Sequence, residues 1–456
     1  MGAIPDVAGV DAATVAAVER ETSELLSQLI RIDTSNPPGN ETKVAEFMAA
    51  WFRAHGLEGE VVGEPEHRRS FVLRLEGARP GPSLLLLSHE DVVPAVAADW
   101  QVPPFAGVVR DGYVWGRGAL DIKNLVAAHA VAARRLAADG GFAGTLVYAC
   151  TADEEEGTAA GARWLVRNRP DLVRCDYVLN EGGAGFLERG GRRLYLLENG
   201  EKGTAQFRIV VRGEGGHASV PRRDGNAVVA AAHVVAALAA HETPVVVDDG
   251  SAALVRALVD DPGLARRLRD PAAARAALTE LERRDPVAAD LVTPLYGFGF
   301  APTVVRSNSV AVNVYPSRVE VDVDCRTLPG RDEREVEAEV RAALAGVEAD
   351  WRLEWLSVVP GNASPPDTPF ADAIRRVMAR FVPDCEVVPA PSVGFTDSNW
   401  FRAAFPETVA YNFCPFLVED DRAVLPRFHS HDERIHVRDL AFQALVAEAV
   451  ARELLA

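Results

Sequence analysis

The chain has 456 residues, of which 48% are hydrophobic and 25% charged, and its formal net charge is −18. This length favours two or three domains, and the composition is that of an ordinary globular protein. The negative charge argues against nucleic acid and anionic membrane surfaces as partners, because both are themselves negative. The sequence shows no run of 18 apolar residues and no basic segment leading into an apolar one near its start. The five widely spaced cysteines are typical of reduced core thiols, so we expect a cytoplasmic protein.

The segment before Gly203 alternates short apolar runs with helical patterns, which predicts a mostly parallel α/β sheet. Residues 84–87 are all leucine, as expected for a strand buried on both faces. A helix is predicted at 125–138, where an Ala- and Leu-rich stretch ends before two glycines. Further buried strands are predicted at 145–150 and 177–179.

The pattern changes after Gly203 to that of a half-solvated sheet. Apolar residues alternate with charged ones most clearly at 319–326. The predicted order is strand, helix, strand, strand, helix, strand, which is the order of a ferredoxin-like unit. Its elements are predicted at 207–212, 226–239, 309–315, 319–326, 332–345 and 351–357. The segment 241–300 interrupts this unit as a mainly helical insertion.

The α/β pattern returns near the C-terminus, with a strand near 408–413 and a closing helix at 437–455. We therefore expect one α/β domain formed by residues 1–204 and 358–456. It is interrupted by a small α+β domain at 205–357, which carries the helical insertion at about 241–300.

Histidine and acidic side chains follow the predicted parallel strands, where ligands of open α/β sheets gather. His89 directly follows the 84–87 strand, and Asp91 points to the same side of an extended backbone. An Asp in this place can accept the second ring N–H of a metal-ligating histidine. Asp121 follows a glycine-rich turn at the start of a helix, where it can cap the helix or bridge two cations.

A run of acids at residues 153–156 follows the 145–150 strand. These carboxylates repel each other, so we expect either a cation beside them or full exposure to solvent. A carboxylate beside a metal-bound water can act as a general base. Glu181 follows the 177–179 strand, and His429 precedes the closing helix.

Each of these residues alone has an ordinary interpretation as a strand-end histidine, a helix cap or a loop acid. Together, two histidines and at least three carboxylates at strand ends predict a two-metal site. Such a set suits two zinc ions that share a bridging carboxylate and activate a water between them.

The segments that carry these residues resemble, in their order and amino-acid sequence, those of the co-catalytic zinc metallopeptidase family. This family includes aminoacylases, acetylornithine deacetylase, succinyl-diaminopimelate desuccinylase and glutamate carboxypeptidases. The resemblance covers essentially the whole chain and rests on HEDVVP at 89–94, Trp100, PF at 104–105 and GRGALDIK at 116–123. The motif sequences are most similar to those of the Gly-X carboxypeptidase and aminoacylase branch. It implies a zinc-peptidase-like catalytic domain with a ferredoxin-like lid or dimerisation domain inserted in it.

The resemblance also implies the metal ligands. His89 and Glu181 would be the terminal ligands of one metal, and Glu155 and His429 those of the other. Asp121 would bridge the two metals. Both ions are expected to be zinc, for which cobalt or manganese can substitute.

Further roles come from the same resemblance. Glu154 matches the general base, and Asp91 matches the residue that orients the first histidine. His217 matches a residue that reaches an active site, usually that of the partner subunit of a homodimer. Four positions match substrate-binding residues of the family: Asn313, Arg326, Gly394 and Thr396.

The sequence departs from the family pattern in three places. Glu90 stands where the family has an apolar residue or Thr, and we expect it to point away from the metal ligands. The acidic run leaves a later register open, with Glu155 as base and Glu156 as ligand. His431 competes with His429. The spacing to neighbouring residues favours the first assignment in both cases.

These interpretations predict a metal-dependent hydrolase that cleaves the amide bond of a small carboxylate-bearing substrate, a dipeptide or an N-acyl amino acid. The enzyme would then be a carboxypeptidase, dipeptidase or deacylase. The planar fork of Arg326 suits a substrate carboxylate, since it can bind two oxygens at once. Two alternatives stay open: an amidohydrolase acting on carbamoyl or ureido substrates, and a catalytically silent metal-binding homodimer.

Overall fold

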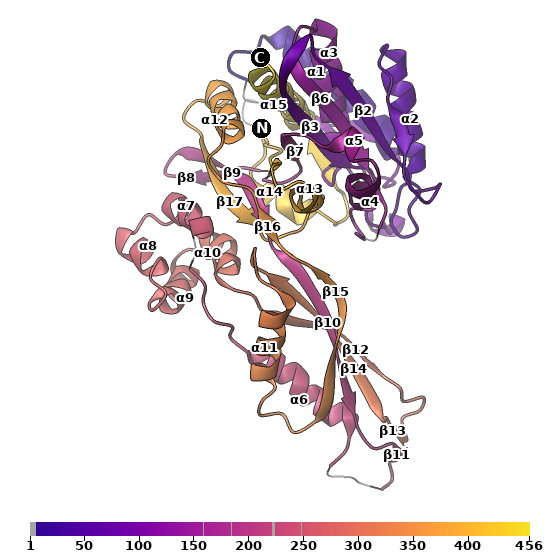
Figure 1. Cartoon of the computed structure of the whole chain (residues 1–456), viewed down its shortest axis with the longest axis vertical. Helices are drawn as coiled ribbons and strands as arrows, with labels where there is room; N and C mark the ends of the chain where they lie inside the picture. Colours follow the sequence, from indigo (N-terminus) through magenta and orange to yellow (C-terminus); the bar gives the residue numbers. More distant parts are fainter. Residues whose placement is uncertain (1–5, 158, 184, 221–223, 248) are drawn as a thin grey trace. The chain divides into compact units, whose positions relative to one another are not determined.

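A computed structural model describes residues 6–157, 159–183, 185–220, 224–247 and 249–456. The chain forms two compact units (Figure 1), each described here by itself. Unit 1 comprises Met1–Asn199, Ser364–Ala390 and Thr396–Ala456, and unit 2 comprises Gly200–Ala363 and Pro391–Phe395.

The main sheet of unit 1 has the strand order β1-β2-β6-β3-β7-β18-β9. Its four central strands pair in parallel: β6 (Ala143–Thr151), β3 (Arg79–His89), β7 (Tyr177–Asn180) and β18 (Val409–Asn412). The outer strands pair antiparallel: β1 (Glu60–Val62), β2 (Ser70–Glu76), β8 (Leu187–Arg189) and β9 (Arg192–Glu201). Strand β17 (Glu386–Ser392) pairs with β9.

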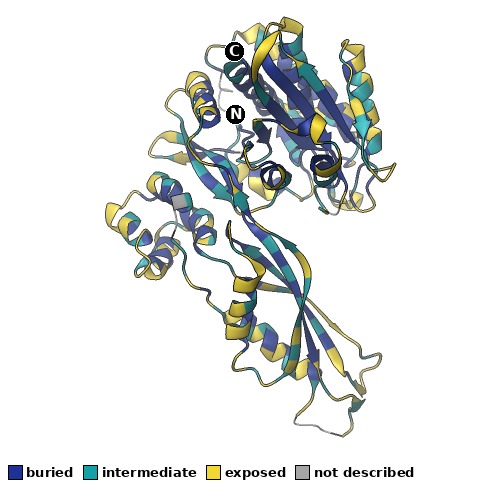
Figure 2. Cartoon of the chain, in the orientation of Figure 1, coloured by how far each residue is buried: buried dark blue, intermediate teal, exposed yellow. Residues whose placement is uncertain are grey.

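The central strands are buried on both faces, which explains why they appear in the sequence as continuous apolar runs. Leu84 and Leu86 pack in one core with α1 (Ala12–Ile30), α3 (Lys123–Asp139) and α15 (Val437–Leu454). Leu85 and Leu87 pack on the opposite face with α4 (Gly161–Asn168) and α13 (Ser398–Ala404). Figure 2 shows these strands buried along most of their length. The predicted α/β fold of this part is confirmed.

The remaining elements of unit 1 lie around this sheet. A separate small sheet consists of β4 (Val108–Arg110), β5 (Tyr113–Trp115) and β19 (Arg434–His436). The other helices are α2 (Thr42–Ala54), α5 (Pro170–Val173), α12 (Pro369–Phe381), α14 (Asp421–Val424), η1 (Ala97–Asp99) and η3 (Leu425–Arg427).

Unit 2 contains an antiparallel sheet in the order β12-β14-β10-β15, formed by β12 (Phe300–Ser307), β14 (Arg318–Thr327), β10 (Gly203–Arg212) and β15 (Asp350–Val359). One face packs on α6 (Ala227–Ala240) and α11 (Glu333–Ala343). With β10 counted as the first strand, the spatial order is second, third, first, fourth. This is the ferredoxin-like arrangement that the sequence predicted.

One strand of this unit was predicted in the wrong place. Residues 309–315 were expected to form the second strand, but β12 at 300–307 pairs with β14 instead. Val310 and Val312, which lie within the predicted strand, are 94% and 103% exposed. Only Val314–Tyr315 is extended there, as β13, and it pairs with β11 (Gly216–His217). Strand β12 was missed because Pro302 and an irregular register interrupt its alternation.

The insertion between α6 and β12 contains α7 (Asp249–Leu258), α8 (Pro262–Leu268), α9 (Ala274–Arg284), α10 (Pro286–Val292) and η2 (Thr293–Tyr296). The last short strand of unit 2, β16 (Asn362–Ala363), pairs with the end of β9. Among the described residues no helix is both long and apolar enough to cross a membrane.

Candidate metal centre

The carboxyl ends of three neighbouring parallel strands bring the predicted metal ligands of unit 1 together. His89 is the last residue of β3, and Glu181 directly follows β7. Glu154 and Glu155 lie in the turn after β6, and Asp121 lies just before α3. Because β6, β3 and β7 are adjacent and parallel, their ends meet at one edge of the sheet.

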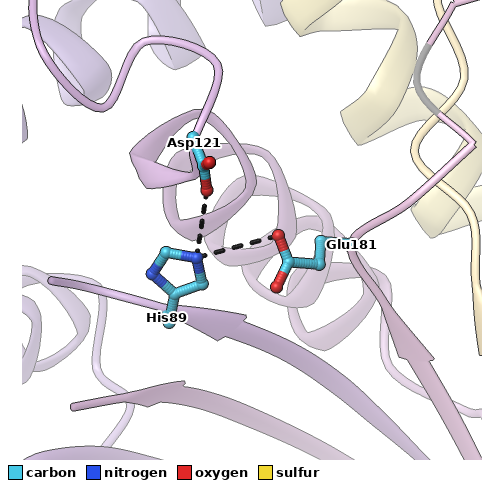
Figure 3. Close-up of side chains that lie close together, drawn as sticks. All are labelled: His89, Asp121 and Glu181. Atoms are coloured by element: carbon cyan, nitrogen blue, oxygen red, sulfur yellow. Dashed lines mark ion pairs between the residues drawn. The ribbon is translucent and has the colours of Figure 1, made fainter. Parts of the chain in front are cut away.

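The first cluster consists of His89, Asp121 and Glu181, whose ligand atoms all lie within 4.8 Å of one another. The Nε2 atom of His89 is 3.2 Å from Asp121 Oδ1 and 3.7 Å from Glu181 Oε2. Figure 3 shows both carboxylates pointing at this ring nitrogen. The nitrogen is buried and makes no well-aligned hydrogen bond within the described part of the chain.

The second cluster consists of Asp121, Glu155 and His429. The Nε2 atom of His429 is 2.9 Å from Asp121 Oδ2 and 3.2 Å from Glu155 Oε2. The two oxygens of Asp121 therefore face different histidines. Histidine nitrogen and carboxylate oxygen are the donors that zinc and similar cations use. The residues fit two divalent cations that share Asp121.

The clusters concentrate negative charge on carboxylates that are largely shielded from solvent. Burial raises the pKa of Glu154 well above its usual range, and the nearby charge of Glu181 adds to this effect. Burial opposes ionisation of Asp121 too, but hydrogen bonding with His429 and the charge of the nearby His89 outweigh it and hold its pKa below the usual range. Hydrogen bonds with Asp121 and then Glu155 raise the pKa of His429 to about 10. A bound cation would compensate these carboxylates in place of protons.

Asp91 fixes both His89 and the acidic turn. Its Oδ1 lies 3.4 Å from His89 Nδ1, and its backbone oxygen lies 3.0 Å from the same nitrogen. The carboxylate also accepts the backbone N–H groups of Glu154 and Glu155, each at 3.1 Å. With Nδ1 held by Asp91, Nε2 is the nitrogen that His89 presents to the clusters.

The competing assignments lie outside both clusters. Glu156 and His431 are exposed. Glu154 belongs to neither cluster, but its Oε2 lies 3.9 Å from His89 Nε2. Glu90 is fully buried, and burial followed by the charge of Glu41 raises its pKa well above the usual range.

Four predicted residues are described within unit 2. His217 is exposed, and its Nδ1 is 2.7 Å from Ser219 Oγ. The Asn313 carbonyl accepts the Ala218 N–H at 3.0 Å. Arg326 Nε donates to Asp324 Oδ2 at 3.0 Å, and the Gly394 N–H donates to Ser392 Oγ at 3.2 Å.

The fourth substrate-binding prediction, Thr396, is buried in unit 1. Its hydroxyl oxygen accepts from Asn180 Nδ2 and from Asn412 Nδ2, each at 3.3 Å. The next residue, Asp397, accepts the Thr151 hydroxyl at 2.7 Å, and burial raises its pKa to about 8. Asp397 was not among the predicted site residues, since no spacing links it to the metal ligands.

Glu433 was likewise not predicted to support the site. Its Oε1 accepts the backbone N–H groups of Leu120 at 2.6 Å and Asp121 at 3.1 Å. Its Oε2 is 2.6 Å from Arg117 Nη1. This buried carboxylate fixes the turn that presents Asp121. The spacing between Glu433 and the predicted ligand His429 was the one sequence feature that pointed to a role for Glu433 near the metal site.

A parallel α/β sheet with two histidine-carboxylate clusters sharing one aspartate defines a class, the metal-dependent hydrolases. The chain belongs to Peptidase family M20/M25/M40, whose family model matches residues 85–453. The resemblance found in the sequence is thereby confirmed: the protein is a metallopeptidase-type hydrolase that cleaves amide bonds.

Individual relatives agree with this assignment. Human N-fatty-acyl-amino acid synthase/hydrolase PM20D1 is 26% identical over 442 residues, covering 91% of this chain and 84% of that protein. Succinyl-diaminopimelate desuccinylase of Xanthomonas campestris pv. campestris (strain B100) is 38% identical over 172 residues, covering 37% of this chain and 44% of that enzyme. The M20 family metallo-carboxypeptidase Sso-CP2 from Sulfolobus solfataricus has the same fold, with a TM-score of 0.74 at 15% identity, covering 95% of this chain and 99% of that chain.

Proposed function

We propose that the protein is a dizinc hydrolase that removes the acyl group from an N-acyl amino acid or cleaves a dipeptide. The observation that carries this proposal is the placement of Asp121 between His89 and His429. Glu181 and Glu155 complete the two clusters. Cobalt or manganese should substitute for zinc, since both accept nitrogen and oxygen donors.

The bound zinc ions would supply Lewis acidity toward the amide carbonyl and lower the pKa of the attacking water. Glu154 is the general base in this proposal. It lies beside His89 of the first cluster without belonging to either cluster, and its raised pKa suits a group that takes and returns a proton. Glu154 would accept the proton of the water and deliver it to the leaving amine. Asp91 would keep His89 and the turn with Glu154 in place.

The substrate class follows from the relatives and from unit 2. The human relative, which matches most of the chain, is named for N-fatty-acyl amino acids, so these come first among candidate substrates. Arg326 and Asn313 would bind the substrate carboxylate together with the Gly394–Thr396 loop, and His217 would donate a hydrogen bond to the oxyanion. Amidohydrolysis of carbamoyl or ureido substrates remains the second candidate.

We further propose a cytoplasmic homodimer formed through unit 2. Helix α6 is apolar on its outer as well as its inner side, with Val228 48% and Val229 50% exposed. The edge strand β12, which packs beside α6, exposes Val305 by 59%. An unpaired edge and an exposed apolar helix face invite pairing with a second copy. The exposed His217 would then be free to serve the partner's active site.

The decisive test combines a substrate panel with Glu154→Gln. The zinc- and cobalt-loaded enzymes should hydrolyse N-acyl amino acids or dipeptides in preference to carbamoyl amino acids. Glu154→Gln should lower kcat by about 10²- to 10⁴-fold, the range of general acid–base catalysis, with zinc content unchanged. Full activity of this variant with both zinc ions bound would contradict the proposal.

The homodimer is tested separately by light scattering after size-exclusion chromatography. Val229→Asp with Val305→Asp should convert the dimer to a monomer. A wild-type chain that is a fully active monomer would exclude the dimer and the role of His217 across it.

A further inference from the structure

Arg68 forms two largely buried ion pairs, one with Glu41 and one with Asp153, the residue before Glu154 and Glu155. Its Nη2 atom is 2.7 Å from Glu41 Oε1 and 2.9 Å from Asp153 Oδ1. Its Nε is 3.2 Å from Glu41 Oε1. The Arg68 side chain is 11% exposed, and the two carboxylates are not exposed at all.

Asp153 is the residue through which Arg68 reaches the acidic turn. It has a φ of +66°, a conformation that a non-glycine residue keeps only when its surroundings enforce it. Its Oδ2 accepts the backbone N–H groups of Ala159 and Ala160, each at 3.1 Å. Asp153 thus ties the beginning of the turn to its far end. Glu154 and Glu155 lie between these tied points.

A second carboxylate holds the middle of the same turn. Asp91 accepts the N–H groups of Glu154 and Glu155. The Asn36 amide joins the two anchors, since its Nδ2 is 2.9 Å from Asp91 Oδ2 and 3.4 Å from Asp153 Oδ1. The backbone of the turn is therefore fixed by two buried aspartates. Asp91 faces His89, and Asp153 faces Arg68.

The repulsion among the acids at 153–156 predicted either a cation beside them or full exposure to solvent. Arg68 is such a cation, and it compensates the charge of Asp153. A guanidinium suits the task because its planar fork serves two carboxylates at once and stays charged when buried. Gly39 makes room for this arrangement. A Cβ atom at Gly39 would lie 2.6 Å from Arg68 Nε and 2.7 Å from Glu41 Oε2.

We propose that Arg68 is a positioning residue for the hydrolysis: anchored by Glu41, it holds Asp153 and thereby the backbone that presents Glu154 and Glu155 to the metal clusters. This inference rests on the proposed function for the roles of those two glutamates. Arg68 itself touches neither ligand cluster. Its action passes through Asp153 and the turn.

The test compares Arg68→Met with Arg68→Lys and with the control Arg74→Met. Arg74 lies on the neighbouring strand β2, where its Nε pairs with the largely exposed Glu76 at 2.9 Å. In Arg68→Met, hydrogen exchange of the Glu154, Glu155, Ala159 and Ala160 amides should accelerate at least about tenfold relative to core amides of β3. Zinc affinity of the apoprotein, measured against a chromophoric chelator, should fall about 10- to 100-fold. This is the usual loss when a residue that orients metal ligands is mutated.

The kinetic pattern separates positioning from mere folding support. In Arg68→Met, kcat should fall while KM changes less than about twofold, because Arg68 pairs with Glu41 and Asp153 and is not among the proposed substrate-binding residues. Arg68→Lys should recover part of the zinc affinity and part of kcat, since it keeps the charge but not the fork. Arg74→Met should leave all three measurements unchanged. Wild-type exchange rates and zinc affinity in a folded Arg68→Met protein would overturn the proposal.

A second variant decides the matter where Arg68→Met does not fold, since it leaves Glu41 and Asp153 buried without their counter-charge. Glu41→Gln removes the anchoring charge but leaves Arg68 beside Asp153. It should produce the same changes in smaller size, and unchanged exchange rates and zinc affinity in Glu41→Gln would equally reject the proposal. Neither measurement depends on what Glu154 does chemically. An active Glu154→Gln enzyme would therefore reject the proposed function without touching the exchange result.

Discussion

Carboxylates in the metal clusters of unit 1 and on the charged sheet face of unit 2 differ in how their charge is compensated. In unit 2, Asp322 lies directly opposite Arg208 on the neighbouring strand, with Arg208 Nε 2.6 Å from Asp322 Oδ1. Arg326 likewise pairs with Asp324 on its own strand. These carboxylates have local partners within the protein. Around Asp121, several largely buried carboxylates share two histidines, an arrangement that suits cations from outside the protein.

This difference teaches how to distinguish a binding site from a structural charge network. The hydrogen bond with Arg208 lowers the pKa of Asp322, as in an ordinary ion pair. Burial instead raises the pKa of Glu181 and of Glu155. Carboxylates that are desolvated, close together and share few protein cations indicate a site that can bind a metal cation.

The largest expected effect comes from removing the shared ligand. Asp121→Ala should lower kcat/KM by more than about 100-fold, beyond the loss that outer partners of metal ligands cause. It should also lower the zinc content of the purified protein below two ions per chain. Asp322→Ala is the matched control in unit 2 and should keep full activity and zinc content. Two tightly bound zinc ions in Asp121→Ala would show that Asp121 is not the shared ligand, and would contradict the proposed difference between the two charge networks.

Removal of zinc should destabilise the protein through unit 1. Ligand that binds only the folded state adds about 4 kcal/mol to the free energy of unfolding at 1,000 times its Kd. The chelated protein should therefore melt earlier, and added zinc should restore the melting temperature. The same experiment on Asp121→Ala should show a much smaller shift. Loss of zinc should also grow as the pH falls, since protons compete for His89 and His429.

A smaller effect should come from Asp439, a buried carboxyl of unit 1 outside the metal clusters. Burial raises its pKa to about 7. Its Oδ1 accepts the N–H groups of Leu417 at 2.7 Å and Val418 at 2.6 Å. Because the folded pKa lies above the unfolded one, the folded state binds the extra proton between about pH 4 and pH 7, and stability falls as the pH rises through this window.

The check is the pH dependence of Asp439→Asn, which keeps a carbonyl acceptor but cannot ionise. Chemical unfolding of the wild type should show decreasing stability from pH 4 to pH 7, with the zinc-free protein used throughout. The variant should lose part of this slope. An unchanged slope would mean that Asp439 ionises normally in the folded protein.

The smallest effect is expected on the charged face of unit 2. Arg208→Met should lower the melting temperature less than zinc removal does, and the change should shrink further in high salt, because salt weakens an ion pair that is only partly buried. kcat and zinc content should stay at wild-type values. A large loss of zinc in this variant would show that the two charge networks are coupled.

The sequence determined the parts of this protein that depend on local patterns. The four leucines at 84–87 predicted a strand buried on both faces, and Leu84 and Leu85 indeed pack into opposite cores. The two-residue spacing of His89 and Asp91 predicted that both would face one side, and their side chains lie 3.4 Å apart. The family followed from motif wording, because several short segments with fixed spacing occurred in the expected order.

Only the tertiary structure decided how distant segments combine. Nothing near residues 153–156 in the sequence shows that Arg68 and Asn36 reach Asp153, since the sheet brings these segments together across β2, β6 and the loop before α2. The second strand of unit 2, β12, is defined by its pairing with β14, because its sequence does not alternate regularly between apolar and polar residues. Ligands with strand-end spacing can be predicted because the backbone fixes them locally. The groups that hold those ligands in place come from anywhere in the chain, and packing alone selects them.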